Sequence, residues 1–296
     1  MPAKRKILIF KGDRPPERST AHHIYKRLVA ECPDEYYIEN LADIAFVIRG
    51  SDVACVSMAS SRDIATYDLL YIRGTGHPPI RHALALYAAH HKLTLLGEEA
   101  HYFQHATKLT QYVALALAGV PVPDTIFATR AWIVQAAARC GATYPAVVKA
   151  IDGSNGLDNM LIKCADKLDD LTFEYPVVQQ YIPNDFDYRV IVAGGEVMLA
   201  YKRIRTDTAN YKNNVAEGAT REYVPRLSPE VRDMALRAAA ITRRDLGGID
   251  IIRDKHTGAH YVLEVNSNFG IRDMGDGISE KHIARLSEYL HKRASS

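Results

Sequence analysis

Short apolar runs alternate with amphipathic patterns over the first hundred residues of the chain. The runs predict strands at Lys6–Phe10, Asp52–Met58, Asp68–Ile72 and Thr94–Gly97. The amphipathic patterns predict helices at Ser19–Ala30 and Ile80–His90. Strands that alternate with helices are typical of a parallel, doubly wound sheet. The pattern therefore predicts an α/β domain over residues 1–100.

The pattern changes after residue 100, where strands begin to follow one another directly. Helices are predicted at Lys108–Ala118 and Arg130–Arg139, and strands at Thr125–Ala128, Ala146–Ala150, Met160–Cys164, Val177–Ile182, Tyr188–Ala193 and Val197–Arg203. Gly194-Gly195 between the last two runs is a strong signal for a two-residue β-hairpin. The sequence thus predicts α+β architecture, which we divide into a central unit at residues 101–182 and a C-terminal unit at residues 183–296.

The last seventy residues carry clear helix signals. Ser228 and Pro229 suit the N-cap and first position of a long helix that we expect to end after Asp245, at Gly247-Gly248. Strands are predicted at Ile249–Arg253 and His260–Asn266, and a final helix at Ser279–Lys292. The segment Arg203–Glu222 has no clear periodicity and predicts a long irregular loop.

Composition narrows the class of protein. The chain has 296 residues and a net charge of +2, which argues against a dedicated nucleic-acid binder. Its four cysteines lack C-x-x-C spacing and predict reduced thiols. Its apolar runs are too short to span a membrane. We therefore expect a cytoplasmic protein with neither nucleic acid nor membrane as a partner.

The hairpin formed by the last two predicted strands places acids opposite one another. Folding it about Thr257 brings Asp250 opposite Glu264, and Asn266 follows on the same face as Glu264. Facing carboxylates repel, and a hard divalent cation such as Mg²⁺ removes that cost. The alternative is an exposed hairpin face with solvated acids.

A lysine and a glycine-rich loop suggest a phosphate site. Lys149 ends a predicted strand and is followed by Gly-Ser-Asn-Gly, which differs from a Walker A loop because no Gly-Lys-Ser/Thr follows. The same residues also fit an ordinary turn. Arg189 and Arg203 lie in otherwise apolar strands, so they need either an anion or a structural salt bridge. A flat adenine could pack against Tyr181 and Ile182.

These features follow a specific order along the chain: Lys108, Lys149 with its glycine loop, Gln-Gln-Tyr-Ile, Asp-Tyr-Arg, Lys-Arg, Asn-Asn, Gly-Ile-Asp and Leu-Glu-Val-Asn. This order resembles the ATP-grasp superfamily, and within it the RimK-like branch of carboxylate–amine ligases, over roughly residues 100–275. The resemblance implies an ATP-grasp fold. The first hundred residues resemble the family's pre-ATP-grasp domain only in their alternation of predicted strands and helices.

The resemblance also implies roles for individual residues. Lys108 and Lys149 would hold the nucleotide phosphates, under a lid loop containing Ser154 and Gly156. The adenine hinge would be Gln180, Tyr181 and Ile182. Asp187 would be the acid near the ribose with Arg189 as its basic partner, and Arg203 the arginine at the transferred phosphoryl group. Asn214 would lie near the substrate, and the Mg²⁺ ligands would be Asp250, Glu264 and Asn266.

The implied reaction joins a carboxylate to an amine through an acyl phosphate, with ATP and Mg²⁺, or Mn²⁺ as an alternative. Ala216-Glu-Gly-Ala stands where the branch usually has His-Arg-Gly-Gly, and Asn266-Ser-Asn-Phe-Gly where it often has Asn-Ala-Ser-Pro-Gly. The first departure falls where substrate contacts are expected. Three hypotheses follow: a ligase acting on a peptide or protein by amino-acid addition or side-chain cross-linking, a ligase for small amino acids or dipeptides, and a non-catalytic ATP-binding regulator. The branch often forms homo-oligomers.

Overall fold

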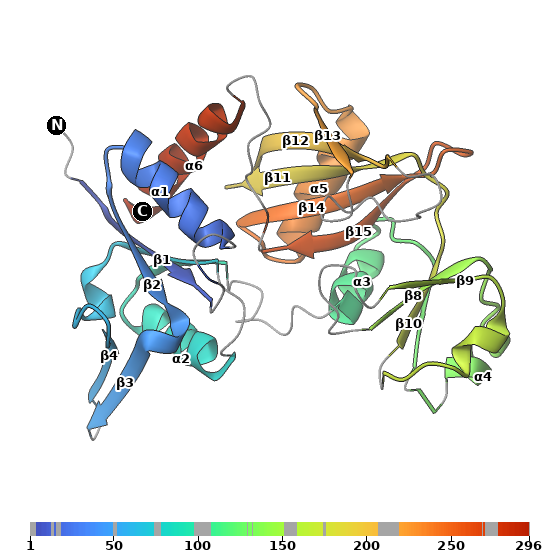
Figure 1. Ribbon diagram of the computed structural model, residues 1–296, viewed down its shortest axis with the longest axis horizontal. Helices are drawn as coiled ribbons and strands as arrows, with labels where there is room; N and C mark the ends of the chain where they lie inside the picture. The colour runs from blue at the N-terminus through green and yellow to red at the C-terminus, as the bar shows by residue number, and fades with distance from the viewer. Residues whose placement is uncertain are drawn as a thin grey trace.

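The computed structural model describes residues 4–295, except 13–14, 16–18, 50–51, 74–77, 98–107, 129, 132, 151–158, 174–175, 207–218, 268 and 270–277. Figure 1 shows three groups of elements, each built on its own sheet. Among the described residues, no helix is both long enough and apolar enough to cross a membrane.

The N-terminal group is a parallel sheet with helices on both faces. In spatial order its strands are β2 (Glu35–Asn40), β1 (Lys6–Lys11), β5 (Leu69–Ile72) and β6 (Thr94–Leu96). Alternate residues of β1 explain the two covered faces: Ile7 and Ile9 pack with α1 (Thr20–Glu31) and α6 (Ile278–Ala294). Leu8 and Phe10 pack with α2 (Pro78–His90). A separate hairpin joins β3 (Ile44–Arg49) to β4 (Asp52–Ser57).

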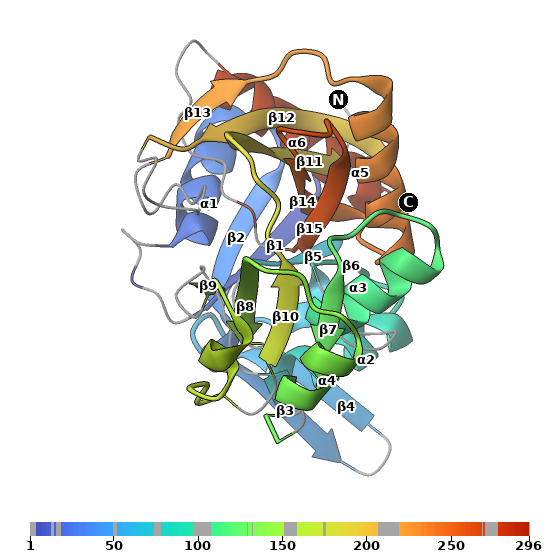
Figure 2. The same cartoon turned by 90° about the vertical axis from the view of Figure 1, so that its right-hand side faces the viewer.

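The central group is a smaller antiparallel sheet. Its strands, in order, are β7 (Thr125–Phe127), β10 (Pro176–Gln180), β8 (Ala146–Ala150) and β9 (Met160–Ile162). Helix α4 (Ile133–Arg139) packs on it through Ile133 and Ala137. Helix α3 (Lys108–Leu117) precedes this sheet in the chain, and Figures 1 and 2 place it between the central and C-terminal sheets.

The C-terminal group is an antiparallel sheet in the order β13 (Thr220–Tyr223), β12 (Glu196–Ile204), β11 (Phe186–Ala193), β14 (Leu246–Arg253) and β15 (His260–Asn266). The predicted Gly194-Gly195 hairpin is confirmed, and both glycines have the positive φ that such a turn requires. Val190, Ile249 and Ile251 on one face pack against α5 (Pro229–Ile241). The other face is partly polar and carries the site described below.

The last helix ties the first and last sheets together. Tyr36 Oη and Ser287 Oγ lie 2.8 Å apart, and His291 Nδ1 lies 2.9 Å from a carboxylate oxygen of Asp34. Arg285 donates to the carbonyl oxygen of Met198 in β12 at 2.9 Å. Figure 1 shows α6 beside α1. The domain limits 1–100, 101–182 and 183–296 remain a prediction. Helix α6 belongs to the last range by sequence but packs on the N-terminal sheet.

Two sequence expectations about individual elements were wrong. Helix α5 ends at Ile241 rather than near Asp245, because Arg243 takes a positive φ and the N–H of Arg244 donates to the carbonyl oxygen of Ala239, as in a Schellman cap. Gly247 and Gly248 then lie inside β14, which begins at Leu246. The pattern also did not predict β2, β3 and β13, of which β2 and β13 are edge strands. The segment Arg203–Glu222 is therefore not a loop throughout, because β12 runs to Ile204 and β13 begins at Thr220.

Candidate active site

The polar face of the C-terminal sheet is organised by strand register. Arg189 in β11 pairs with Asp250 in β14, and Asp250 pairs in turn with Glu264 in β15, so these three side chains share one face. The opposition of Asp250 and Glu264 predicted from the hairpin is confirmed. In the neighbouring row, Asp187 in β11 pairs with Arg203 in β12. Two acids and two arginines are thereby brought together from three strands.

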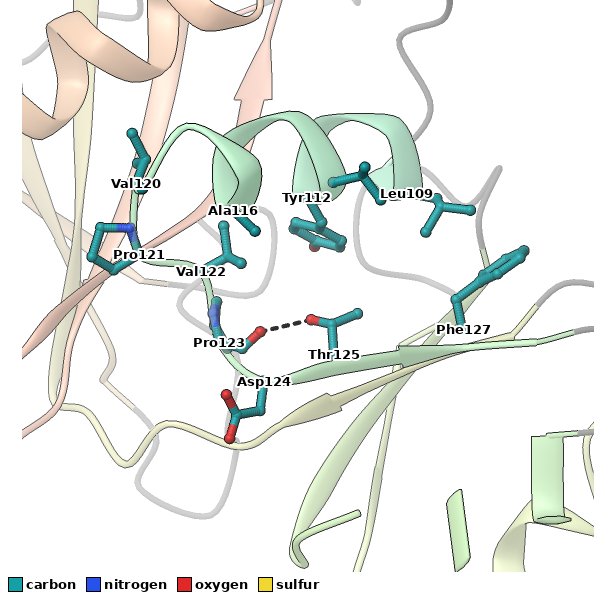
Figure 3. Close-up of a pocket in the computed structure, with 12 residues that line it drawn as sticks. Leu109, Tyr112, Ala116, Val120, Pro121, Val122, Pro123, Asp124, Thr125 and Phe127 are labelled. Carbon is teal, nitrogen blue, oxygen red and sulfur yellow. Dashed lines mark hydrogen bonds between the residues drawn. The ribbon is translucent and has the colours of Figure 1, made fainter. Parts of the chain in front are cut away.

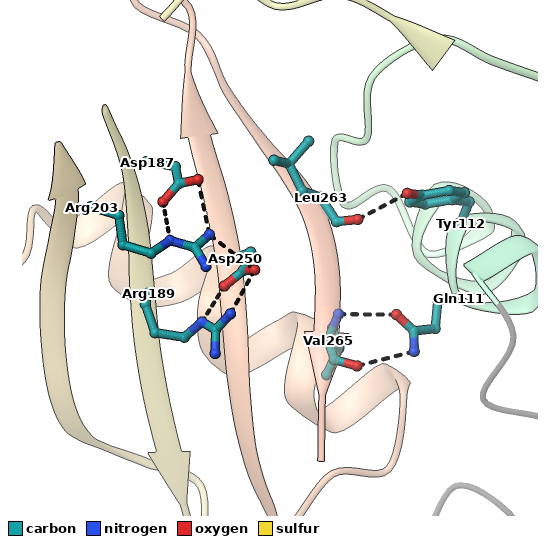
Figure 4. A network of polar contacts seen from close by, with 8 residues as sticks. All are labelled: Gln111, Tyr112, Asp187, Arg189, Arg203, Asp250, Leu263 and Val265. Carbon is teal, nitrogen blue, oxygen red and sulfur yellow. Dashed lines mark hydrogen bonds and ion pairs between the residues drawn. The ribbon is translucent and has the colours of Figure 1, made fainter. Parts of the chain in front are cut away.

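These four side chains form one ion-pair network, shown in Figure 4. Arg203 donates through Nε and Nη2 to the two carboxylate oxygens of Asp187, at 2.6 and 2.9 Å, and its Nη2 lies 3.0 Å from Asp250 Oδ2. Arg189 donates through Nη2 to Asp250 Oδ2 at 2.9 Å and through Nε to Oδ1. We expected Arg189 to partner Asp187. Each acid instead forms its bidentate ion pair with the arginine directly opposite it on the neighbouring strand: Asp187 with Arg203, and Asp250 with Arg189. Directly opposite residues lie closer together than residues two apart on one strand.

The two acids differ in their titration. Burial raises the pKa of Asp187 above its ordinary value, and the opposing effect of the Arg203 guanidinium is too small to reverse the shift. Burial acts in the same direction on Asp250, but Arg189 and Arg203 together bring the pKa of Asp250 below its ordinary value. Asp250 is therefore the more firmly ionised of the two. Arg189 and Arg203 therefore form the structural salt bridges that the sequence offered as one alternative. Within the described residues, the Nη1 donors of both arginines take no part in this network.

Helix α3 is fixed to the free edge of β15, on either side of Glu264. The Gln111 amide donates to the carbonyl oxygen of Val265 and accepts from its N–H, both at 3.0 Å. The Tyr112 hydroxyl donates to the carbonyl oxygen of Leu263 at 3.0 Å. These bonds cap the edge strand. They also set the start of α3, at the half-buried Lys108, relative to the strand that carries Glu264 and Asn266.

Lys149, on β8, is buried among neutral groups. It is 9% exposed and donates from Nζ to Gln179 Oε1 at 2.7 Å and to the Tyr112 hydroxyl at 3.5 Å. Gln179, 1% exposed, donates in turn to Thr125 Oγ1 at 3.0 Å. Burial lowers the pKa of Lys149 to about 8, although the charges of Glu264 and Asp250 oppose the shift. Among the described residues, no carboxylate contacts this ammonium group, so an added anion would stabilise it.

A pocket of about 540 Å³ lies between α3 and the segment 119–127 and is lined by Tyr112, one of the two side chains that bond Lys149. Figure 3 shows the Tyr112 ring pointing into it from α3, above Thr125. Thr125 Oγ1 donates to the carbonyl oxygen of Pro123 at 2.7 Å, which completes a chain of hydrogen bonds running from Lys149 through Gln179 to the main chain. None of the predicted nucleotide-binding residues lines this pocket.

The predicted adenine hinge follows β10 directly. The backbone N–H of Gln180 donates to the carbonyl oxygen of Asp124 at 2.8 Å, and that of Tyr181 to the carbonyl oxygen of Pro145 at 3.2 Å. Ile182 is buried, and its carbonyl oxygen accepts from Asn184 Nδ2 at 2.8 Å. The backbone N–H groups of Gln180 and Tyr181 are therefore already used, and their predicted role at an adenine edge would need their carbonyl oxygens or side chains.

The predicted Mg²⁺ ligands supply only oxygen donors, which suits this ion. Asp250 accepts three arginine hydrogen bonds, against a capacity of about four for a carboxylate. Asn266 Nδ2 is buried and has no hydrogen-bond partner within the described part of the chain. Glu264 is half-buried and faces Asp250. Among the described residues, no three His, Cys, Asp or Glu side chains form a group suited to a metal. The set of two acids and one amide fits Mg²⁺ and remains a prediction.

Three predicted site residues, Ser154, Gly156 and Asn214, lie outside the described residues. Conversely, sequence reasoning did not single out Gln111 or Tyr112, and it gave no role to Gln179, the first residue of the quoted Gln-Gln-Tyr-Ile motif. A signal was present for all three, because each is a polar residue within an otherwise apolar helix or strand. Such residues need buried partners, but the partners come from distant parts of the chain.

Comparison with known proteins adds to this geometry. A model of the RimK-like ATP-grasp domain family matches residues 105–286. A probable alpha-L-glutamate ligase of Methanococcoides burtonii is 26% identical over 205 residues, which are 67% of each chain.

Solved structures agree on the fold. The ATP-grasp ligase PsnB, complexed with minimal precursor, Mg and ADP, has a TM-score of 0.68 at 18% identity and covers 98% of both chains. A RiPP-associated ATP-grasp ligase of Chryseobacterium gregarium, in complex with ADP and a leader and core peptide, has a TM-score of 0.63 at 14% identity, covering 98% of this chain and 95% of that one.

The chain belongs to the RimK-like ATP-grasp family. The resemblance found in the sequence is thereby confirmed, and so is the ATP-grasp fold. The family is one of ATP-grasp ligases, which use ATP and Mg²⁺.

Proposed function

We propose that this protein is an MgATP-dependent carboxylate–amine ligase that modifies a peptide or protein, by amino-acid addition or side-chain cross-linking. The observation that carries the proposal is Lys149, a buried ammonium whose contacts among the described residues are all neutral. It lies close enough to Asp250 and Glu264 for their charges to act on its pKa. A buried cation of this kind suits the phosphates of a nucleotide, and the acids suit its metal ion.

The reaction has two steps. A carboxylate oxygen of the substrate attacks the γ-phosphorus of ATP, the bond to the β–γ bridging oxygen breaks, and ADP leaves an acyl phosphate behind. An amine then attacks the acyl carbon, phosphate leaves with its bonding electrons, and the amine loses a proton to give the amide. Both steps move negative charge between oxygens, so stabilising fixed charges contribute most of the catalysis.

The residues take separate roles in this scheme. Lys149, together with Lys108 at the start of α3, would bind phosphate oxygens. Asp250, Glu264 and Asn266 would hold Mg²⁺, which when bound neutralises charge on the phosphates. Arg203 and Arg189 would direct their remaining Nη1 donors at the transferring phosphoryl group, while the network with Asp187 and Asp250 keeps both guanidinium groups in place.

The choice of a peptide substrate is supported by the two solved neighbours, each complexed with a precursor or with a leader and core peptide. The name of the curated relative makes glutamate the first amino acid to test, as donor of either the amine or the carboxylate. A ligase for small amino acids or dipeptides is the alternative that the same name favours.

The test is release of ADP and phosphate from MgATP in the presence of pooled amino acids and pooled acidic peptides. We expect release that depends on one pool and that falls by at least a hundredfold in Glu264→Ala. Glu222→Ala is the matched control, because Glu222 is more than half exposed and bonds only Lys202 among the described residues. Equal turnover in the Glu264 and Glu222 variants would contradict the metal assignment.

A further inference from the structure

Within the described part of the chain, Arg73 is a second buried cation without an acidic partner. It directly follows β5 and is 2% exposed, which makes it the bulkiest of the fully buried side chains. Its Nη1 donates to the Tyr71 hydroxyl at 3.1 Å and its Nη2 to the carbonyl oxygen of Phe269. Its guanidinium carbon lies 4.7 Å from the centre of the Phe269 ring and 5.6 Å from that of Tyr71.

This environment is electrostatically incomplete. Buried arginines are normally matched by a carboxylate or phosphate, since an unpaired charge in the interior is costly. Among the described residues no carboxylate contacts Arg73, and its Nε atom is buried without any hydrogen-bond partner. Two aromatic faces and two neutral oxygens hold the guanidinium in one orientation and leave its Nε–H edge for an anion.

The position of Arg73 links the first sheet to the candidate active site. The backbone N–H of Arg73 bonds the carbonyl oxygen of Phe10 at the carboxyl end of the parallel sheet, the edge at which open α/β sheets bind ligands. Phe269 also packs against Gly248: a Cβ built on Gly248 would lie 2.8 Å from Phe269 Cβ and 3.2 Å from Arg189 Cδ. Phe269 therefore contacts both the Arg73 guanidinium and the side of Gly248 that also faces Arg189.

We propose that Arg73 forms a carboxylate-binding subsite, in which its Nε–H edge receives a carboxylate group of the substrate beside the reacting centre. The inference rests on the proposed ligase function, since a substrate with a carboxylate is what that function requires. Phe269 follows Asn266, a predicted Mg²⁺ ligand, by three residues in the chain.

The first measurement needs no turnover. The thermal unfolding midpoint of the MgADP-loaded protein is compared in sodium glutamate and in sodium chloride at equal ionic strength, for wild type, Arg73→Gln and Arg73→Lys. We expect glutamate to raise the midpoint of wild type clearly, that of Arg73→Lys less, and that of Arg73→Gln no more than chloride does. L-glutamine, which has an amide in place of the side-chain carboxylate of glutamate, is the control that shows whether this carboxylate is the group bound. Equal stabilisation of wild type and Arg73→Gln by glutamate would overturn the proposal.

The second measurement uses the ligase reaction itself. In Arg73→Gln the KM for the carboxylate substrate should rise about tenfold or more, with the KM for ATP unchanged, because the charge-assisted hydrogen bond from Nε is lost. Arg237→Gln is the control, since Arg237 is 46% exposed. An unchanged carboxylate KM in Arg73→Gln would reject the subsite while leaving the ligase function intact. Absence of turnover in wild type would reject the proposed function, and the glutamate measurement would then decide the subsite separately.

Discussion

Lys149 is a buried cation and Arg189 and Arg203 of the C-terminal sheet are largely buried ones, but their partners are opposite in kind. Arg189 and Arg203 are held by two aspartates in a network of two positive and two negative charges. Lys149 is held by the amide oxygen of Gln179 and the hydroxyl of Tyr112, and its pKa is lowered to about 8 by burial. The arginine network is electrically complete in itself, whereas the lysine site is complete only with an anion.

This difference distinguishes a structural role from a ligand-binding role. A closed network of charges stabilises geometry, since removing one member strands its partner in a low-dielectric interior. An unmatched cation lowers the stability of the empty protein and raises its affinity for a negatively charged ligand. Arg73, like Lys149, is a buried cation that no described carboxylate contacts. Substitution of Arg73 tests whether such a cation also marks an anion-binding site there.

Removing an acid from the closed network should have the largest effect on stability. Asp250→Asn leaves Arg189 without a carboxylate and Arg203 with Asp187 alone, and we expect the free energy of unfolding to fall by about 3–5 kcal/mol. Urea unfolding followed by circular dichroism measures it. Asp233→Asn, at an exposed acid with a 3.8 Å contact to Arg237, should change it by less than about 0.5 kcal/mol. A loss below about 1 kcal/mol in Asp250→Asn would remove the contrast between the two regions.

Removing the unmatched cation should act in the other direction. Lys149→Met should leave the unfolding free energy at pH 7 unchanged or raise it by up to a few kcal/mol, while ATP turnover falls by at least a hundredfold. Lys167→Met, at a 63% exposed lysine, is the control and should leave both quantities almost unchanged. Destabilisation by Lys149→Met comparable to that of Asp250→Asn would show that Lys149 is a structural residue.

The pH dependence of this stability difference follows from the lowered pKa. Folded Lys149 loses its proton near pH 8, and the unfolded lysine near about 10.4. Between these values the unfolded chain binds more protons, so the wild type gains stability from this group as the pH rises. The advantage of Lys149→Met in urea unfolding should therefore shrink from pH 8 upward and be lost above about pH 10.4. A constant difference across this range would contradict the lowered pKa.

Filling the space beside the arginine network should have a moderate effect. In Gly248→Ala the new methyl group would meet Phe269 Cβ at 2.8 Å and Arg189 Cδ at 3.2 Å, so we expect a loss of about 1–3 kcal/mol and weaker turnover. Gly247→Ala adds the same atom toward Arg244, where the nearest contact is 3.2 Å, and should cost less. Thermal unfolding of the two variants compares them directly, and equal costs would mean that the space beside Arg189 is not special.

The smallest effect is expected where neutral groups position the lysine. Gln179→Leu removes the acceptor that holds Lys149 Nζ at 2.7 Å, and we expect the KM for ATP to rise about three- to tenfold with little change in kcat. Tyr112→Phe removes the weaker 3.5 Å contact and the bond to Leu263, and should raise that KM less. Steady-state kinetics with varied ATP measures both, and a fall in kcat at constant KM would argue against a positioning role for Gln179.

The sequence predicted those parts of the site that depend on local pairing. The Gly194-Gly195 turn fixes the pairing of β11 with β12, and the turn near Thr257 places Asp250 opposite Glu264, because a hairpin determines which residues face each other. The exchange of partners between Asp187 and Arg189 could not be predicted in the same way. It depends on β11 lying between β12 and β14, which is a property of the whole sheet.

The contacts between separate sheets were the least predictable. Gln111 caps β15 from a position 154 residues earlier in the chain, and Arg73 bonds a carbonyl group 196 residues later. Strand β2 was missed because Glu35-Tyr-Tyr-Ile-Glu-Asn has no strict alternation, and its place at the sheet edge tolerates polar residues. In these cases the sequence shows only that a polar group lies among apolar neighbours, and the fold supplies its partner.

The most direct test of this account is the affinity for MgADP at pH 7 and pH 9, measured by titration calorimetry on wild type and Lys149→Met. If the unmatched lysine is the phosphate site, wild type should bind about tenfold more weakly at pH 9, because most of the free lysine is then neutral when its pKa is about 8. Lys149→Met should bind more weakly than wild type at pH 7 and show almost no change between the two pH values. Equal affinities of the two proteins at pH 7, or a wild-type affinity that does not change with pH, would contradict the assignment of Lys149 to the nucleotide.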